Sequence, residues 1–493
     1  MAIFWVEYHS TMRRFPRFLA ALLAVSLVLP ARSSDDLPEL GDIAGSEFSV
    51  AAERRIGLQI MHEIRWREPA FLDDPDVEAY LNQLGGRLAA VSADPGTGFY
   101  FFAINDPAIN AFAMPGGYIG VHAGLILAAQ SESELAGVMA HEIAHVTQRH
   151  IARQVFQSKK IGMASMVAMG LALLAARSNG QVAGAAAVTS QAGAISAQLA
   201  FSRDFERESD RVGFDLLSRA GFDPRGMSLF FERLQKAVRL YENNATAYLR
   251  THPLSGERVT DMQNRELQVP YRQIPDSVDF QLVRARLRAQ QGIPAEAVRD
   301  FENLLAEGKH AQRPAALYGL AQAQFRARNW PAAEKALREA RTAKNGSAMI
   351  EHLLADVRIA QGDVEGGLAI YRSAAERFPR HHGLVFGYAA ALVAAKRYPE
   401  ALRFVDAQLS AFPDEVRLYR LRAESYAGLG RRAPQHLALA EAAALQGQTQ
   451  AAIEQLNLAQ RAGDANFFEN STIDARQREL KQRRIDEMKE KRN

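Results

Sequence analysis

A 34-residue repeat in the second half of the chain constrains its fold more than any other feature. Similar four-residue segments begin at Trp330, Val364 and Tyr398, and a Phe-Pro pair recurs at Phe378 and Phe412, again 34 residues apart. The segments between these points are rich in alanine, and their apolar residues recur with helical spacing. One pair of helices cannot bury its apolar face alone, so successive pairs must stack into a curved solenoid.

Alanine-rich helical pairs with this period are the signature of tetratricopeptide repeats. A related unit begins at Gly292, and residues 437–462 resemble a degenerate last pair with a turn at Gly447. We therefore expect a repeat domain at residues 278–462. The charged residues 463–493 that follow are expected to form a tail, either a solvated helix or a frayed end.

The first half of the chain has a different character, because residues 33–270 mix helical and strand patterns. Aromatic and apolar residues predict a strand at 99–104, and a second strand at 118–121 follows a Pro-Gly-Gly turn. Ser131 and Glu134 form a capping box, which predicts that a long helix begins there. The expected fold is thus mostly α: an α+β domain with a small sheet, followed by the α-solenoid.

Two apolar segments bear on localisation. Arginines precede an apolar run at 18–29, and Ala31 offers a small residue for cleavage, so residues 1–31 are predicted to be a secretory signal peptide. An uncleaved signal anchor is the alternative, although the run is shorter than the ~20 residues that a membrane span needs. Residues 161–200 predict a helical hairpin, which is either buried core or an element that forms a lid or a peripheral membrane contact.

The absence of cysteine restricts the chemistry of the chain. It excludes thiol catalysis, thiolate metal sites and disulfides, so any metal must be held by His, Asp or Glu. The 59 Lys and Arg residues exceed the 56 Asp and Glu residues only slightly, with a formal net charge of +3. This small excess does not indicate nucleic-acid binding.

A His-Glu-x-x-His motif lies within the predicted long helix. His141 and His145 are four residues apart, so both imidazoles lie on one helical face and can approach a single Zn²⁺. Glu142 is turned about 100° away, where it can accept a proton from zinc-activated water and pass it to the leaving amine. The alternative is a pair of surface histidines, but apolar neighbours such as Ile143 place the motif at a buried boundary.

A tetrahedral zinc site needs a further protein ligand. The sequence lacks the downstream glycine and histidine of the metzincin motif, and His150 is out of helical register, so we expect His150 on a polar face. Glu206 and Asp210 are carboxylates at helical spacing. Glu206 is a candidate ligand, and Asp210 is a candidate acceptor for the free N–H of a zinc-bound imidazole. Taken alone, this pair is more typical of an exposed charged helix.

Three ordered motifs together resemble a known family. They are H-E-x-x-H at 141–145, F-E-x-x-x-D at 205–210, and Asn-Ala-Phe-Ala-Met-Pro-Gly-Gly-Tyr-Ile at 110–119. All three are similar to motifs of the CAAX prenyl protease and HtpX-type metallopeptidases. The resemblance implies a gluzincin-type metallopeptidase domain with one zinc ion per chain and Glu142 as the catalytic base. It implies three zinc ligands: His141, His145 and Glu206.

The segment Thr-His-Pro-Leu at 251–254 also resembles a segment of this family. The resemblance implies that His252 lies near the metal and occupies its open position in a resting state. It also implies that Arg258 can contact a developing oxyanion. The alternative for His252 is a loop residue that caps a helix.

Soluble family members with a signal peptide and C-terminal repeats are similar to this chain over nearly all of its length after residue 40. They imply a periplasmic zinc endopeptidase with chaperone activity in the quality control of outer-membrane proteins. Its substrates would be misfolded or stalled outer-membrane proteins, and its repeats would bind the outer-membrane assembly machinery. Segment 110–119 would lie along the cleft and pair with an extended substrate. The alternative is a repeat scaffold or chaperone with a latent or structural metal site, which would not require Glu142.

Overall fold

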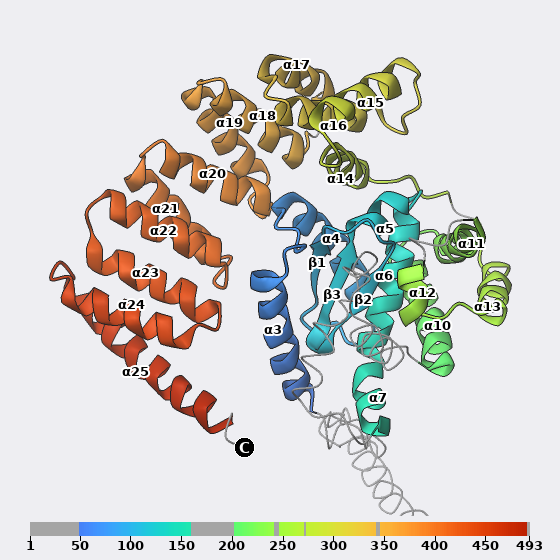
Figure 1. Ribbon diagram of the computed structural model, residues 1–493, viewed down its shortest axis with the longest axis horizontal. Coiled ribbons are helices and arrows are strands. Elements are labelled where there is room, and N and C mark those ends of the chain that lie inside the picture. Colours follow the sequence, from blue (N-terminus) through green and yellow to red (C-terminus); the bar gives the residue numbers. More distant parts are fainter. Residues whose placement is uncertain (1–48, 159–201, 241–245, 271–272, 342–345, 491–493) are drawn as a thin grey trace, which may run out of the picture. The chain divides into compact units, whose positions relative to one another are not determined.

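The computed structural model describes residues 49–158, 202–240, 246–270, 273–341 and 346–490, most of which lie in helices (Figure 1). The signal peptide expected at 1–31 and the hairpin expected at 161–200 lie outside the described residues. Within the described ranges, every helix is too short or too polar to span a membrane.

Three short strands form a mixed sheet in the N-terminal domain: β1 (Tyr100–Ile104), β2 (Ala111–Ala113) and β3 (Tyr118–His122). β3 lies in the middle, parallel to β1 and antiparallel to β2. Both strands predicted from the residue pattern are present. β2 is a short edge strand within segment 110–119, where the family resemblance, and not the residue pattern, indicated a strand. The turn between β2 and β3 contains Gly116 and Gly117, whose φ angles of 78° and 90° favour glycine.

Four helices flank this sheet in the sequence: α3 (Val50–Arg67), α4 (Pro75–Ala89), α5 (Ala123–Ala128) and α6 (Glu132–Thr147). The start of α6 agrees with the predicted capping box. Ser131 Oγ accepts a hydrogen bond from the Glu134 N–H, and the Glu134 carboxylate accepts one from the Gln130 N–H. Every residue of α6 from Glu132 to His145 is buried. This helix is therefore the centre of the domain, and its histidine motif is enclosed by other elements.

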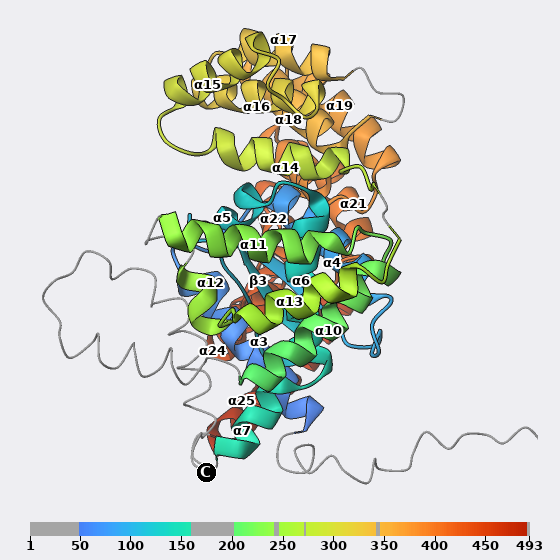
Figure 2. The same cartoon turned by 90° about the vertical axis from the view of Figure 1, so that its right-hand side faces the viewer.

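The remaining helices of this domain are α7 (His150–Ser158), α10 (Arg203–Arg219), α11 (Arg225–Leu240), α12 (Thr246–Thr251) and α13 (Gly256–Glu266). α10 packs directly on α6 (Figure 2). Gly213 permits this close approach, because a Cβ atom at that position would stand 3.0 Å from the backbone nitrogen of His141. A larger residue at position 213 would push α10 away from the histidine motif.

The C-terminal domain consists of helical pairs, as the 34-residue period predicted. Successive second helices begin at Trp330, Val364, Tyr398 and Arg432, each 34 residues after the last. The turn residues that precede them share the same spacing and all have positive φ: Arg328, Gly362, Lys396 and Gly430. The helices are α14 (Val278–Ala289), α15 (Pro294–Ala306), α16 (Arg313–Arg326), α17 (Trp330–Ala340), α18 (Ala348–Ala360), α19 (Val364–Arg377), α20 (His382–Ala394), α21 (Tyr398–Leu409), α22 (Val416–Gly428), α23 (Arg432–Leu445), α24 (Thr449–Arg461) and α25 (Phe467–Glu490).

The charged residues near the C-terminus form a helix with one buried face. Ile473 and Leu480 of α25 are fully buried in a cluster with apolar residues of α23 and α24. The expectation of a wholly solvated helix or a frayed end is therefore corrected. α25 covers the last helical pair, which otherwise would expose its apolar face.

The first repeats contact α4 through buried charged groups, here called the interface cluster: Asp74, Asp76, Arg286 and His352. Arg286 Nε lies 2.6 Å from Asp74 Oδ2, and its Nη1 lies 3.2 Å from Asp76 Oδ2. His352 Nδ1 lies 3.0 Å from Asp76 Oδ2. Phe280 of α14 also packs on Tyr80 of α4, with ring centroids 6.4 Å apart. Polar and apolar contacts together join the two domains.

Candidate metal centre

The two histidines of the motif lie side by side on one face of α6. Their Nε2 atoms are 3.0 Å apart, and both side chains are fully buried. The spacing of four residues in an α-helix accounts for this arrangement. Two ring nitrogens directed into the same buried space need either a proton or a metal ion between them.

Glu206 enters this space from α10. Its Oε2 lies 3.5 Å from His141 Nε2, and its Oε1 lies 3.4 Å from His145 Nε2. The side chain is only 1% exposed, so the sequence-based alternative of an exposed charged helix does not describe this position. Ser202 caps α10 one turn earlier by accepting a hydrogen bond from the Phe205 N–H.

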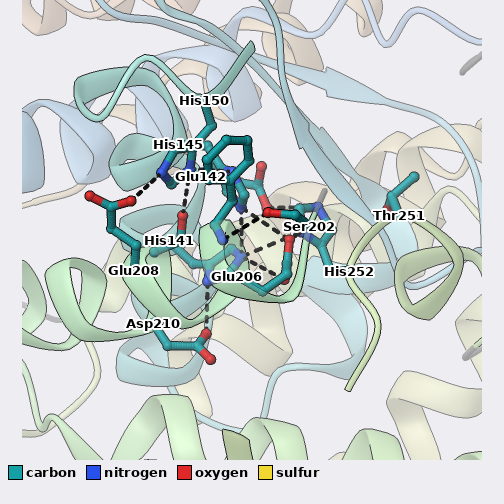
Figure 3. A network of polar contacts seen from close by, with 12 residues as sticks. His141, Glu142, His145, His150, Ser202, Glu206, Glu208, Asp210, Thr251 and His252 are labelled. Carbon is teal, nitrogen blue, oxygen red and sulfur yellow. Dashed lines mark hydrogen bonds and ion pairs between the residues drawn. The ribbon is translucent and has the colours of Figure 1, made fainter. Parts of the chain in front are cut away.

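His252 closes the group from the residue that follows α12. Its Nδ1 lies 3.3 Å from His141 Nε2 and 3.0 Å from Glu206 Oε1 (Figure 3). Each of the four residues offers one ligand atom, and these atoms all lie within 4.8 Å of one another. We call this group the metal cluster: His141, His145, Glu206 and His252. Three imidazole nitrogens and one carboxylate oxygen are a donor set that suits tetrahedral Zn²⁺.

A carboxylate and a guanidinium surround one side of the metal cluster. Asp210 Oδ1 lies 3.0 Å from His141 Nδ1, the ring nitrogen that faces away from the cluster. Arg258 donates to both oxygens of Asp210, at 2.6 and 2.7 Å. Its Nη1 also lies 2.8 Å from Glu206 Oε2 and donates to the Pro253 carbonyl at 2.7 Å. In this arrangement Arg258 holds two carboxylates, whereas the sequence placed it near a developing oxyanion.

Glu142 lies beside the metal cluster but is not one of its four members. Its side chain is fully buried, and its Oε1 lies 3.4 Å from His252 Nε2. Burial raises the pKa of Glu142, although nearby His252 and His141 act in the opposite direction. A carboxylate with a raised pKa accepts a proton more readily near neutral pH.

Burial and charge act differently on the ligand atoms themselves. Burial alone would lower the pKa of His141, but hydrogen bonds to Asp210 and Glu206 raise it to about 9. For His145, burial dominates and lowers the pKa well below its ordinary value. Burial would raise the pKa of Glu206, but the surrounding histidines, His252 foremost, hold it well below its ordinary range. Glu206 is therefore anionic, which is the form that binds a metal ion.

His150 and Tyr248 are two residues near the site whose roles the sequence did not indicate. His150 was expected on a polar face, but it is fully buried and its Nδ1 lies 3.0 Å from His145 Nδ1. The expectation failed because α6 ends at Thr147, so helical register does not continue to residue 150. The ring of Tyr248 stacks on His252, with centroids 4.6 Å apart. A tyrosine four residues before a histidine, at helical spacing, is a weak signal for this contact.

Comparison with known protein families assigns both domains. The profile of peptidase family M48 matches residues 75–266. Two tetratricopeptide-repeat profiles match residues 280–348 and 358–424. The first match contains all four members of the metal cluster, and the others lie within the solenoid.

Curated relatives resemble the chain over almost its whole length. It is 33% identical to the putative beta-barrel assembly-enhancing protease of Vibrio cholerae serotype O1, over 94% of this chain and 97% of the relative. It is also 33% identical to the beta-barrel assembly-enhancing protease of Escherichia coli (strain K12), over 94% of this chain and 95% of the relative. The mitochondrial metalloendopeptidase OMA1 of Schizosaccharomyces pombe is 31% identical over 37% of this chain and 51% of its own.

Proposed function

The chain belongs to peptidase family M48, and from that membership we propose that it is a periplasmic endopeptidase of misfolded or stalled outer-membrane β-barrel proteins. Zinc-dependent peptide hydrolysis follows from the family. The substrate class is proposed from bacterial relatives that share both domains and are called beta-barrel assembly-enhancing proteases. The observation that carries the enzymatic proposal is the convergence of four buried ligand atoms beside Glu142.

We assign zinc binding to His141, His145 and Glu206, and proton transfer to Glu142. Bound zinc lowers the pKa of water to about 7 and polarises a carbonyl oxygen. Glu142 accepts the proton of the attacking water and then donates it to the leaving amine. The raised pKa of the Glu142 carboxyl suits both steps, because the group must exchange a proton near neutral pH.

His252 is proposed to be a fourth ligand in a resting state. Its Nδ1 belongs to the same set of ligand atoms as the other three side chains. A catalytic zinc site keeps one position for water and substrate, so His252 must leave that position before hydrolysis. His252 follows the six-residue helix α12 directly, so a movement of this short element would open the site.

Asp210 and Arg258 are proposed to orient the ligands without contacting substrate. Asp210 Oδ1 lies 3.0 Å from His141 Nδ1, where it would accept the N–H of a zinc-bound imidazole and keep His141 Nε2 directed at the metal. Arg258 holds both Asp210 and Glu206 in place. We propose this role in place of the expected contact with an oxyanion, because Nε, Nη1 and Nη2 of Arg258 all contact these carboxylates or Pro253.

The repeat domain and the edge strand are proposed to engage proteins. Tetratricopeptide solenoids present extended concave surfaces, and we assign to this one the binding of the outer-membrane assembly machinery and a chaperone activity. β2 lies at the edge of the sheet, where an extended substrate can add a strand.

Cleavage of a matched pair of proteins tests the substrate class. Purified protein with stoichiometric zinc is incubated with an unfolded outer-membrane β-barrel protein and with an unfolded soluble periplasmic protein of similar length. We expect cleavage of the first at a higher kcat/KM. Equal kcat/KM values would refute the β-barrel preference, while absence of cleavage in both cases would refute the endopeptidase assignment.

A further inference from the structure

A fourth histidine, His150, stands behind the metal cluster, on the side of His145 that faces away from it. His150 Nδ1 lies 3.0 Å from His145 Nδ1, and His150 Nε2 lies 3.1 Å from Glu208 Oε2 (Figure 3). Ser209 Oγ also lies 3.2 Å from His150 Nδ1. His150 is fully buried, whereas the Glu208 side chain is 26% exposed. A chain of polar contacts therefore runs from the metal cluster towards the surface of α10.

A turn between α6 and α7 brings His150 to this position. α6 ends at Thr147, and Arg149 has a positive φ of 52°, which is uncommon for a residue other than glycine. The Arg149 guanidinium lies 2.6 Å from Glu53 Oε1 of α3, and this ion pair holds the turn. α7 then begins at His150 itself. Without this turn, a continued helix would carry residue 150 away from His145.

The imidazole of His150 is also fixed in its plane. It stacks on the ring of Phe205, with centroids 4.5 Å apart and an interplanar angle of 11°. Arg153 covers Phe205, with its guanidinium carbon 4.5 Å from the ring centroid, and pairs with Glu208 at 2.9 Å. Side chains of α7 and α10 thus hold His150 and Glu208 in place.

We propose that His150, held by Glu208, is a positioning residue that directs His145 Nε2 at the metal. The proposal rests on the zinc-binding role assigned to His145 above. The two zinc-binding histidines then differ in how they are oriented. Asp210 faces His141 Nδ1 directly, whereas His150 stands between His145 Nδ1 and the carboxylate of Glu208.

The hydrogen-bond directions are consistent along this chain. When His145 Nε2 binds zinc, its proton resides on Nδ1, which donates to His150 Nδ1. His150 then carries its own proton on Nε2 and donates it to Glu208 Oε2. Ser209 Oγ is a second donor within reach of His150 Nδ1. Outer partners such as His150 fix the tautomer and the ring orientation of a metal ligand. His150 itself is not a ligand, because neither of its nitrogens faces the metal cluster.

Zinc affinity measured by competition with a chelator tests the proposal. His150→Leu fills the space without a hydrogen-bonding group, and we expect it to weaken zinc binding about 10- to 100-fold. His150→Asn keeps an acceptor near the position of Nδ1 and should recover part of the affinity. In Co²⁺-substituted protein, His150→Leu should also shift the visible absorption spectrum. Wild-type zinc affinity in His150→Leu would overturn the proposal, even if the apoprotein were less stable.

A second pair of variants leaves the core intact. Glu208→Ala removes the outer acceptor, and we expect a fall in zinc affinity near the lower end of that range. Asp204→Ala removes a carboxylate from the first turn of the same helix, where the side chain is 84% exposed and pairs with Arg207. Asp204→Ala should leave zinc affinity unchanged. Equal effects of the two substitutions would refute a specific role for Glu208, because loss of any carboxylate from this helix would then lower zinc affinity equally.

His145→Ala separates this proposal from the assigned function. If His145→Ala retained wild-type zinc affinity, the zinc site itself would be wrongly assigned. If His145→Ala lost zinc while His150→Leu and Glu208→Ala did not, only the positioning role would fail.

Discussion

The metal cluster and the interface cluster both consist of buried histidine and carboxylate side chains, but they differ in which atoms face one another. In the interface cluster each carboxylate faces a cation: Arg286 reaches both Asp74 and Asp76, and His352 contacts Asp76. In the metal cluster, histidine nitrogens face one another, as the 3.0 Å between His141 and His145 shows. The buried charges of the interface cluster neutralise one another. The converging ligand atoms of the metal cluster need a metal ion between them.

The pKa shifts follow the same division. Burial would raise the pKa of Asp76, but His352 and Arg286 hold it well below its ordinary value. Burial would lower the pKa of His352, but Asp76 raises it. Both partners of this pair therefore favour their charged forms. In the metal cluster, the pKa of His141 is raised while that of His145 is lowered, so the two rings do not favour the same charge. We therefore expect zinc to stabilise the metal cluster and to leave the interface cluster unchanged.

The largest effect is expected for Glu142→Gln. The substitution removes the proton acceptor beside the metal cluster, and kcat should fall by about 100-fold to 10,000-fold. Zinc content, measured by elemental analysis, should remain stoichiometric because Glu142 is not a ligand in this assignment. Asp76→Asn is the matched change in the interface cluster and should leave kcat on a short peptide unchanged. Peptidase activity that persisted in Glu142→Gln would refute the assigned base.

Asp76→Asn should have the next largest effect, on stability. Asp76→Asn leaves Arg286 with Asp74 alone and His352 with only the more distant Asp356, 3.6 Å away. Removing one partner of a buried ion pair costs about 3–5 kcal/mol. The contact between the repeats and α4 should weaken, so limited proteolysis between the domains should accelerate. Asp204→Asn, which changes a carboxylate of α10 that is 84% exposed, is a control for charge. A variant as resistant to proteolysis as the wild type would show that the interface cluster does not hold the domains together.

Zinc binding should raise the free energy of unfolding by less than Asp76→Asn lowers it. Free zinc at about 100 times its Kd adds about 2.7 kcal/mol to the free energy of unfolding. Denaturant unfolding with zinc and with a chelator measures this difference. The wild type and Asp76→Asn should gain the same amount, and Glu206→Ala should gain much less. If Asp76→Asn lost the zinc-dependent gain, the two clusters would be coupled and the comparison between them would fail.

The smallest effect concerns pH at the interface cluster. The pKa of Asp76 is lowered by folding, so its contribution is present above an unfolded value of about 3.9 and is lost as pH falls below it. The pKa of His352 is raised, so its contribution is complete below about 6.5 and is lost as pH rises through the raised value. The interface should therefore be most stable between these limits.

Unfolding measured across pH 6 to 9 tests this window. The wild type should lose more stability than His352→Gln as pH rises, because only the wild type carries a histidine whose pKa is raised by Asp76. His381 acts in the opposite direction, because burial lowers its pKa. His381→Gln should thus increase stability at the acid end. Identical pH profiles for the wild type and His352→Gln would contradict the role given to His352.

The residues closest together in the sequence were the easiest to place. The capping box at Ser131 predicted the start of α6, and the spacing of four residues predicted that His141 and His145 share a face. Both follow from the geometry of a single helix. Glu206 could be proposed as a ligand mainly through family resemblance, because an E-x-x-x-D segment on a charged helix has no local feature that distinguishes a buried ligand from an exposed acid.

The break at Arg149 accounts for the clearest error. Helical register predicted a polar position for His150, and nothing in the residues 147–149 indicated that the helix would end there. The turn depends on Glu53, almost a hundred positions earlier, whose carboxylate pairs with Arg149. The partner of Asp210 was equally hidden, because Arg258 lies in a different helix.

The sequence by itself determined the helical pairs of the solenoid, the enclosed histidine helix and the chemistry of its donors, because these depend on periodicities within one element. Only the tertiary structure decided that His150 and Arg258 stand behind the ligands and how the repeats meet α4. Those contacts join residues from separate helices, and their geometry depends on how closely the backbones pack, as at Gly213 beside His141. No local pattern specifies such a distance.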